Sequence, residues 1–211
     1  MKNIIFDWSG VIKDAFESHL WVVNRIFKKY GLKGLSSEEL RENWQEPFML
    51  FFNKYLPDLT IEEERKRYQD GVSSKDYPKA KAFEGMPELI RRLRQEGNLI
   101  FLITSDLQDS VFNELRKYGL ENVFSNIIVK VHDKTESVQS LINKNKFDLK
   151  ETCIVGDSES EIKTARELGI KSIAVTWGFY PENKLKLANP DFIVHNVKEL
   201  EQILNNNEPK S

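Results

Sequence analysis

Short apolar runs alternate along this chain with segments of helical periodicity. The runs are rich in Ile, Val and Phe and show no polar alternation, which is typical of strands buried on both faces. They lie at 4–6, 99–103, 126–129, 152–155, 172–175 and 191–194. Amphipathic helical segments lie at 87–97, 109–119, 135–145, 158–169 and 197–204. Strand alternating with helix predicts an α/β fold with a doubly wound parallel sheet and right-handed crossovers.

The segment between the first two strands has a different pattern. From about 15 to 80 no strand candidate appears, and apolar residues recur at three- and four-residue spacing, as at Leu20, Val23, Phe27 and Tyr30. This length far exceeds an ordinary connection. We therefore expect a Rossmann-like core of residues 1–14 and 81–211, with an all-helical domain of three or four helices inserted at 15–80.

Composition narrows the class of protein. The chain has 211 residues, 40% hydrophobic, with a net charge of -2, so nothing favours nucleic acid or an anionic membrane. One cysteine, Cys153, excludes an internal disulfide and suits a reducing compartment. No apolar run is long enough for a membrane span, so we expect a cytoplasmic protein. The sequence does not indicate an oligomeric state.

Polar residues follow four of the predicted strands. They are Asp7, the run from Thr104 to Asp106, the lysines Lys130 and Lys134, and an acidic run from Asp157 to Glu161. In an open parallel sheet these strand ends form the ligand-binding edge. A carboxylate there can attack phosphorus to give an acyl phosphate, and the charge that develops needs cations and hydrogen-bond donors. Mg²⁺ held by Asp7 and Asp157 would supply part of that charge.

Each of these residues alone has an ordinary structural interpretation. An Asp after a strand is commonly a turn residue or a helix cap, Thr104 and Ser105 would cap the next helix, and Lys134 would be a solvated surface residue. Acids in a first helical turn are favoured by the helix dipole. Their joint appearance at four successive strand ends favours the chemical interpretation.

With these motifs the chain resembles the haloacid dehalogenase superfamily, in the subclass with a helical cap that includes phosphoglycolate phosphatase and β-phosphoglucomutase. FDWSGVIKD sits where that family has the motif Asp-x-Asp-Gly-Thr or Val. The resemblance implies that Asp7 is the nucleophile and that the main-chain carbonyl of Ser9 binds metal. It further implies a Mg²⁺-dependent phosphatase of a small phosphorylated metabolite.

The other three motifs carry the remaining roles that the resemblance implies. FLITSD places Thr104 as the phosphate-binding hydroxyl, with Ser105 beside it. HDKTE offers Lys134 as the lysine that steadies nucleophile and phosphate, with Lys130 as the alternative. GDSESE makes Asp157 a metal ligand and Glu161 the second, often outer, acid.

Ser9 departs from the family pattern. Phosphatases of the family place there a second aspartate, which protonates the leaving group and then activates water. A serine hydroxyl cannot do this near neutral pH, and general acid–base help is worth ~10² to 10⁴ in rate. A surrogate acid would come from the inserted domain, as Glu42 or Glu46, or from the core, as Asp14 or Asp106.

Two other functions stay open. One is a metabolite-binding or regulatory protein that has lost catalysis. The other is a different transfer reaction through Asp7, such as that of a phosphonatase, which needs a lysine in the inserted domain for a Schiff base. Phe48 falls near the expected place of that lysine, although Lys28, Lys29, Lys33 and Lys54 are available. The aromatic stretch 44–52 is interpreted as the core of a helical bundle, or else as a lining for an apolar leaving group.

Overall fold

The computed structural model describes residues 1–45, 48–131 and 133–205. The chain forms two compact units, one of Met1–Asp14 with Lys81–Ser211 and one of Ala15–Ala80. We call them the core unit and the helical unit. The surrogate acid Glu46 lies outside the described residues. In the part of the chain that the structure covers, no helix has the length and apolar character needed to cross a membrane.

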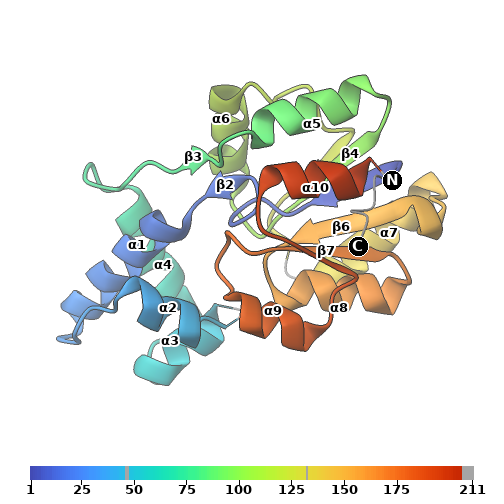
Figure 1. Ribbon diagram of the computed structural model, residues 1–211. Coiled ribbons are helices and arrows are strands. Elements are labelled where there is room, and N and C mark those ends of the chain that lie inside the picture. Colours follow the sequence, from blue (N-terminus) through green and yellow to red (C-terminus); the bar gives the residue numbers. More distant parts are fainter. Residues whose placement is uncertain (46–47, 132, 206–211) are drawn as a thin grey trace. The chain divides into compact units, whose positions relative to one another are not determined.

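A parallel sheet forms the centre of the core unit (Figure 1). Its strands run in the order β5-β4-β1-β6-β7-β8, so the first strand lies in the middle. Their bounds are β1 Asn3–Phe6, β4 Leu99–Ile103, β5 Asn126–Ile128, β6 Thr152–Gly156, β7 Lys171–Val175 and β8 Phe192–Val194. All pairings are parallel, and all six strands were predicted from the sequence. The predicted α/β doubly wound fold is confirmed.

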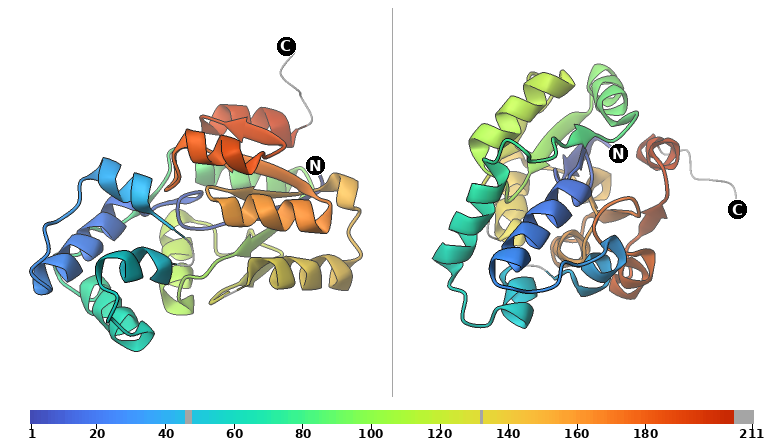
Figure 2. Two further views of the ribbon diagram at one scale, coloured as in Figure 1. Left: turned by 90° about the horizontal axis from the view of Figure 1, so that it is seen from below. Right: turned by 90° about the vertical axis from the view of Figure 1, so that its left-hand side faces the viewer.

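Helices cover both faces of this sheet (Figure 2). Alternate β1 residues supply the two hydrophobic cores, because Ile4 and Phe6 point to one face and Ile5 to the other. The first face is covered by α5 Met86–Gln95, α6 Gln108–Tyr118 and α10 Val197–Leu204, and the second by α7 Lys134–Asn145 and α8 Glu159–Leu168. Residues 182–188 form a further helix, α9 Glu182–Ala188, which the sequence pattern did not predict.

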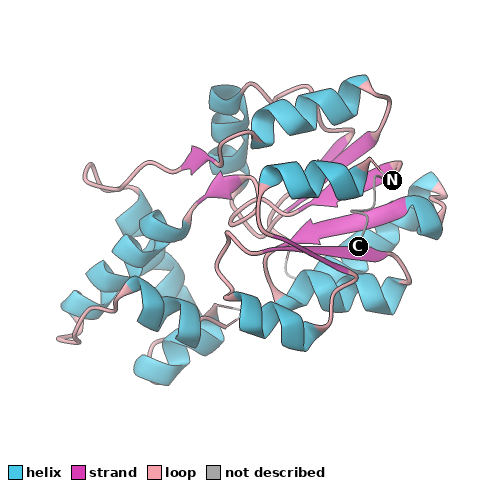
Figure 3. Ribbon diagram, viewed as in Figure 1, coloured by secondary structure: helices cyan, strands magenta, loops and turns pink. Residues whose placement is uncertain are grey.

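The helical unit has no strand among its described residues (Figure 3). Its helices are α1 Phe16–Lys29, α2 Ser37–Asn43, α3 Met49–Tyr55 and α4 Ile61–Val72. Ser36 and Thr60 begin α2 and α4 with capping boxes. Packed aromatic rings fill the interior: Phe27, Trp44, Phe51, Phe52 and Tyr55. The interpretation of 44–52 as bundle core is therefore confirmed for its buried aromatics.

A two-stranded antiparallel sheet marks the points where the chain leaves and re-enters the core unit. It pairs β2 Lys13–Asp14 with β3 Lys81–Ala82. The Phe83 amide also donates to the Ile12 carbonyl at 2.9 Å. The two ends of the inserted segment are thus held together by main-chain hydrogen bonds within the core unit.

Candidate active site

The carboxyl end of the central strand β1 carries Asp7. Its amide donates to the Val155 carbonyl at 3.0 Å, which continues the pairing with β6, and its side chain is almost buried. Directly afterwards the chain turns sharply, because the Trp8 carbonyl accepts from the amides of Ile12 and Lys13, both at 2.9 Å. Asp7 therefore sits on a rigid strand end in the middle of the ligand-binding edge.

Lys134 is the cation beside Asp7. It is the first residue of α7, whose N-cap is Asp133, and its Nζ lies 3.2 Å from Asp7 Oδ1. The same ammonium group contacts Glu161 Oε1. The other lysine considered from the sequence, Lys130, is exposed at the end of β5. The mostly buried ammonium group of Lys134 thus lies between two carboxylates at the end of the central strand.

Glu161 uses both of its carboxylate oxygens within the site. While Oε1 binds Lys134, Oε2 accepts from the Ser158 hydroxyl at 2.7 Å and from the Ser158 amide at 3.1 Å. Ser158 and Glu161 thereby form the capping box that begins α8. Glu161 is therefore fixed by Ser158 at the start of α8 and contacts the ammonium group of Lys134.

Asp157 is enclosed by main chain. It follows β6 and is 3% exposed, and its Oδ2 accepts from the Phe179 amide at 2.6 Å. A Cβ atom added to Gly10 or to Gly178 would lie 2.1 Å from Asp157 Oδ2, so only glycine fits at both places. Gly10 also has φ +89°, which favours glycine. The loop after β1 is thereby brought directly against the second acidic residue of the site.

The oxygen ligands at this edge suit a hard divalent cation. Two nearly buried carboxylates, Asp7 and Asp157, flank the loop that contains Ser9 and Gly10. Among the described residues no group of three or more His, Cys, Asp or Glu side chains is arranged to bind a metal. Mg²⁺ commonly binds through only one or two carboxylates and keeps several waters. Two carboxylates, such as those of Asp7 and Asp157, are therefore enough for the protein's share of a Mg²⁺ site.

Thr104 lies at the end of β4 and is buried. Its amide donates to the Ile128 carbonyl at 3.0 Å and its carbonyl accepts from Val131 at 3.0 Å, so both neighbouring segments hold it. Its Oγ1 accepts from the Asp106 amide at 3.1 Å, which leaves the hydroxyl proton for a ligand. Ser105 beside it is exposed. Thr104 is thus a fixed donor at the strand end next to Asp7.

A second polar network surrounds Ser9. Its hydroxyl donates to Asp106 Oδ2 at 3.0 Å, and the same oxygen lies 3.7 Å from Lys13 Nζ. Lys13 is buried and also pairs with Glu114 at 2.9 Å, which accepts from Trp8 Nε1 at 3.1 Å. Sequence reasoning named Asp106 as one of several surrogate acids and missed Lys13 and Glu114, because no motif relates residues about a hundred positions apart.

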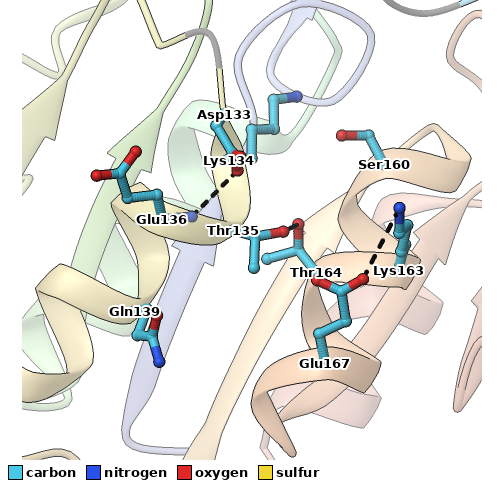
Figure 4. Close-up of a pocket in the computed structure, with 9 residues that line it drawn as sticks. All are labelled: Asp133, Lys134, Thr135, Glu136, Gln139, Ser160, Lys163, Thr164 and Glu167. Atoms are coloured by element: carbon cyan, nitrogen blue, oxygen red, sulfur yellow. Dashed lines mark hydrogen bonds and ion pairs between the residues drawn. The ribbon is translucent and has the colours of Figure 1, made fainter.

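An open cavity of about 400 Å³ lies between α7 and α8 behind this edge. Figure 4 shows Thr135 and Thr164 side by side in its lining, with their hydroxyls hydrogen-bonded at 2.9 Å, while the Lys134 side chain extends away from the other lining residues. Lys163 and Glu167 form an exposed pair on its rim at 3.8 Å. The lining of this cavity is polar and shares Lys134 with the site at the strand ends.

The core unit thus has a parallel α/β sheet with an aspartate, a lysine and two further acids at the carboxyl ends of its strands. Residues 4–175 match the family model of haloacid dehalogenase-like hydrolases. The chain therefore belongs to that family, which confirms the resemblance carried by its motifs, and the prediction of an enzyme of the hydrolase class.

Relatives of known name support the same assignment. The chain is 21% identical to a phosphoglycolate phosphatase of Synechococcus elongatus, over 96% of each chain. It is 24% identical to the pyrophosphatase PpaX of Oceanobacillus iheyensis, over 95% of each. A solved haloacid dehalogenase-like hydrolase from Streptococcus pneumoniae superposes with a TM-score of 0.83 at 21% identity, covering 95% of this chain and 96% of the other. These likenesses span both units of the chain.

Proposed function

We propose that the protein is a Mg²⁺-dependent phosphatase of a small phosphorylated metabolite, which works through an aspartyl phosphate on Asp7. The observation that carries the proposal is the contact between Lys134 and Asp7 at 3.2 Å, on a strand end that also presents Thr104 and Asp157. The names of the relatives, phosphatase and pyrophosphatase, support the phosphoryl group as the target.

The core residues divide the reaction into two steps. In the first, an Asp7 oxygen forms a bond to phosphorus while the bond from phosphorus to the leaving oxygen breaks. In the second, water attacks the same phosphorus and releases phosphate, so that Asp7 regains its carboxylate. Lys134 and the Thr104 hydroxyl stabilise the charge on the phosphoryl oxygens in both steps, and Glu161 keeps Lys134 in place.

Asp7, Asp157 and the main-chain carbonyl of Ser9 are the groups that would hold Mg²⁺, with Glu161 in an outer position. When bound, the ion supplies the positive charge that lets an anionic phosphate approach an anionic nucleophile. Asp157 packs against the loop at Gly10, so the packing of the chain holds these groups near each other before the ion binds.

We assign the choice of substrate to the helical unit, as the cap of the enzyme. The core residues described above address only the phosphoryl group and cannot distinguish one metabolite from another. A cap that excludes water and contacts the rest of the substrate is a common solution. The aromatic core of the unit is occupied with internal packing, so substrate contacts come from its other side chains.

Hydrolysis of p-nitrophenyl phosphate tests the proposal, because its leaving group needs little acid catalysis. We expect wild-type turnover with Mg²⁺, loss of turnover in EDTA and recovery when Mg²⁺ is restored. Asp7→Asn should lower kcat at least ~10³-fold, since the nucleophile is removed. A folded wild type that is inactive with Mg²⁺, or an Asp7→Asn variant that keeps its rate, would overturn the proposal.

The two alternatives make different predictions. A binding protein would retain phosphorylated ligands without turning them over, which equilibrium dialysis would show. A phosphonatase needs a lysine with a lowered pKa for its Schiff base, which burial commonly provides. Lys28, Lys29, Lys33 and Lys54 are all exposed, which favours the phosphatase. Borohydride reduction in the presence of a carbonyl phosphonate would trap a Schiff base as a covalent adduct. We expect no adduct on the chain.

A further inference from the structure

Position 9, where the family resemblance implies a group that takes a proton from water, carries the hydroxyl of Ser9. A hydroxyl alone cannot keep that proton near neutral pH. A carboxylate lies one hydrogen bond away, however, since Ser9 Oγ donates to Asp106 Oδ2 at 3.0 Å. The other core candidate, Asp14, is exposed in β2 and is paired along the backbone with Lys81.

The Asp106 carboxylate lies close to the place that a longer side chain at position 9 would occupy. Serine Oγ takes the position of the aspartate Cγ, and a carboxylate oxygen would extend about 1.2 Å beyond it. Asp106 Oδ2 lies 3.0 Å from Ser9 Oγ. The loop after β4 therefore places the Asp106 carboxylate within a few ångströms of where the carboxylate of an aspartate at position 9 would lie.

Asp106 is fixed from several directions. Its amide binds Thr104 Oγ1 at 3.1 Å and its carbonyl accepts from the Lys130 amide at 3.1 Å. Behind the carboxylate lies Lys13, whose side chain is 7% exposed and whose charge is shared between Asp106 and Glu114. Such support is what a group needs if it must hold its position within a fraction of an ångström during a reaction.

Building on the proposed function, we propose that Asp106 is the positioning residue that makes Ser9 active in the second step. Because the hydroxyl proton of Ser9 is engaged by Asp106, the Oγ lone pairs remain to accept a hydrogen bond from the attacking water. Ser9 and Asp106 together then perform the work of the missing aspartate.

The second step transfers the water oxygen to phosphorus and one proton to solvent. The water oxygen forms a bond to phosphorus while the bond from phosphorus to the Asp7 oxygen breaks, so phosphate leaves and Asp7 becomes a carboxylate again. One proton of the water moves to Ser9 Oγ, and the original Ser9 proton moves to Asp106 Oδ2. Asp106, whose side chain is 26% exposed, then returns its proton to solvent.

Rapid mixing with p-nitrophenyl phosphate and Mg²⁺ tests the proposal, because nitrophenolate departs in the first step without help from Asp106. In Asp106→Asn we expect a burst of about one nitrophenolate per enzyme, followed by turnover slower by ~10²-fold or more. The ratio kcat/KM should stay within about threefold of wild type, since it reports the first step only. A merely structural defect would lower kcat/KM as well.

Further variants test whether Ser9 and Asp106 act together as one proton relay, in which the proton of water passes through Ser9 to Asp106. Ser9→Ala should show the same burst, and Ser9→Ala/Asp106→Asn should be no slower than either single variant, because both belong to one relay. The exchange Ser9→Asp/Asp106→Ser should restore kcat to within about tenfold of wild type. Asp109→Asn, an equivalent substitution at an exposed position of α6, is the matched control and should leave the kinetics unchanged.

The outcomes distinguish this inference from the function on which it rests. If wild type turns over and Asp7→Asn does not, but Asp106→Asn keeps the wild-type kcat, the relay is wrong and the phosphatase stands. Loss of kcat/KM without a burst in Asp106→Asn also overturns the relay. If wild type neither releases nitrophenolate nor is phosphorylated on Asp7, both proposals fall.

Discussion

The two units treat buried charge in opposite ways. In the core unit the buried ammonium groups of Lys134 and Lys13 each lie between two carboxylates. In the helical unit Glu64 is fully buried, and neither of its oxygens has a hydrogen-bond partner among the described residues. Burial raises the pKa of the Glu64 carboxyl to about 7, although the nearby charge of Arg65 lowers it.

Under the proposed function, the difference separates charged groups that serve the reaction from a carboxyl group that only lowers the stability of the fold. Buried ion pairs are at best weakly stabilising, since desolvation offsets their attraction, so two of them at one sheet edge indicate a functional requirement. An unpaired buried carboxyl near neutrality adapts instead by holding its proton. Five substitutions compare the two units.

The largest effect is expected for Lys134→Met in the core unit. The change leaves Asp7 and Glu161 as buried carboxylates without their cation, which should lower the free energy of unfolding by about 3–5 kcal/mol. It should also lower kcat by at least ~10²-fold. Urea unfolding and steady-state kinetics measure the two effects. Lys163→Met, at an exposed lysine of α8, should change stability by less than about 0.5 kcal/mol; equal effects of both substitutions would contradict the assignment.

Phe51→Ala probes the aromatic core of the helical unit. Phe51 is fully buried and lies against Phe27, Trp44 and Phe52. Its removal should destabilise the protein by about 3–5 kcal/mol. Leu50→Ala, at the half-exposed neighbouring residue, should cost far less. If Phe51→Ala left the urea midpoint unchanged and instead weakened substrate binding, the aromatics would be a binding surface after all.

Glu64→Leu should stabilise the helical unit, by about 1–3 kcal/mol at pH 8. The folded pKa of about 7 lies above the ordinary value of 4.5, so the cost of this group is absent below pH 4.5, grows as the pH rises to 7 and is constant above. The gain from the substitution should therefore be smaller at pH 4.5 than at pH 8. Thermal unfolding at both pH values measures it, with the exposed Glu62→Leu as control. A larger gain at the lower pH would show that Glu64 is not the source.

The smallest effects are expected at two capping boxes. Ser36→Ala removes an exposed cap in the helical unit and should cost about 0.5–1 kcal/mol without changing kcat. Ser158→Ala removes a buried cap that also holds Glu161, so it should cost about 1–2 kcal/mol and lower kcat several-fold. Urea unfolding and turnover of both variants measure these effects. An unchanged kcat in Ser158→Ala would contradict the proposal that Glu161 keeps Lys134 in place.

Buried strands were the most predictable part of the fold. Runs such as 99–103 and 152–155 are apolar throughout, and a parallel sheet covered on both faces requires that pattern. The helix α9 was missed because it is short and buries only Leu185. The strands β2 and β3 have two residues each and exist only through their pairing with each other, so no local signal marks them.

In α1 the prediction of the helix was right, but the predicted face was partly wrong. Leu20 is only half-buried and Tyr30 is exposed, whereas His19, Val22 and Ile26 are buried. The buried face includes a histidine that hydropathy does not count, because its ring packs on Trp44 and its Nδ1 lies 3.0 Å from the Tyr68 hydroxyl. The network of Lys13, Asp106 and Glu114 could not be predicted, because it depends on contacts between residues far apart in the sequence. The ordered motifs, in contrast, were enough to predict that Asp7, Lys134 and Glu161 lie together.

The small sheet of β2 and β3 makes the inserted unit exchangeable. Both ends of the segment are joined by hydrogen bonds at Lys13–Asp14 and Lys81–Ala82, so the core keeps its register whatever lies between them. The entropic cost of closing a longer insertion rises only slowly with length. Recombination at two adjacent points would therefore exchange the whole helical unit and keep the sheet of the core unit intact. Under the proposed function, such an exchange would change the substrate and leave the residues that act on the phosphoryl group in place.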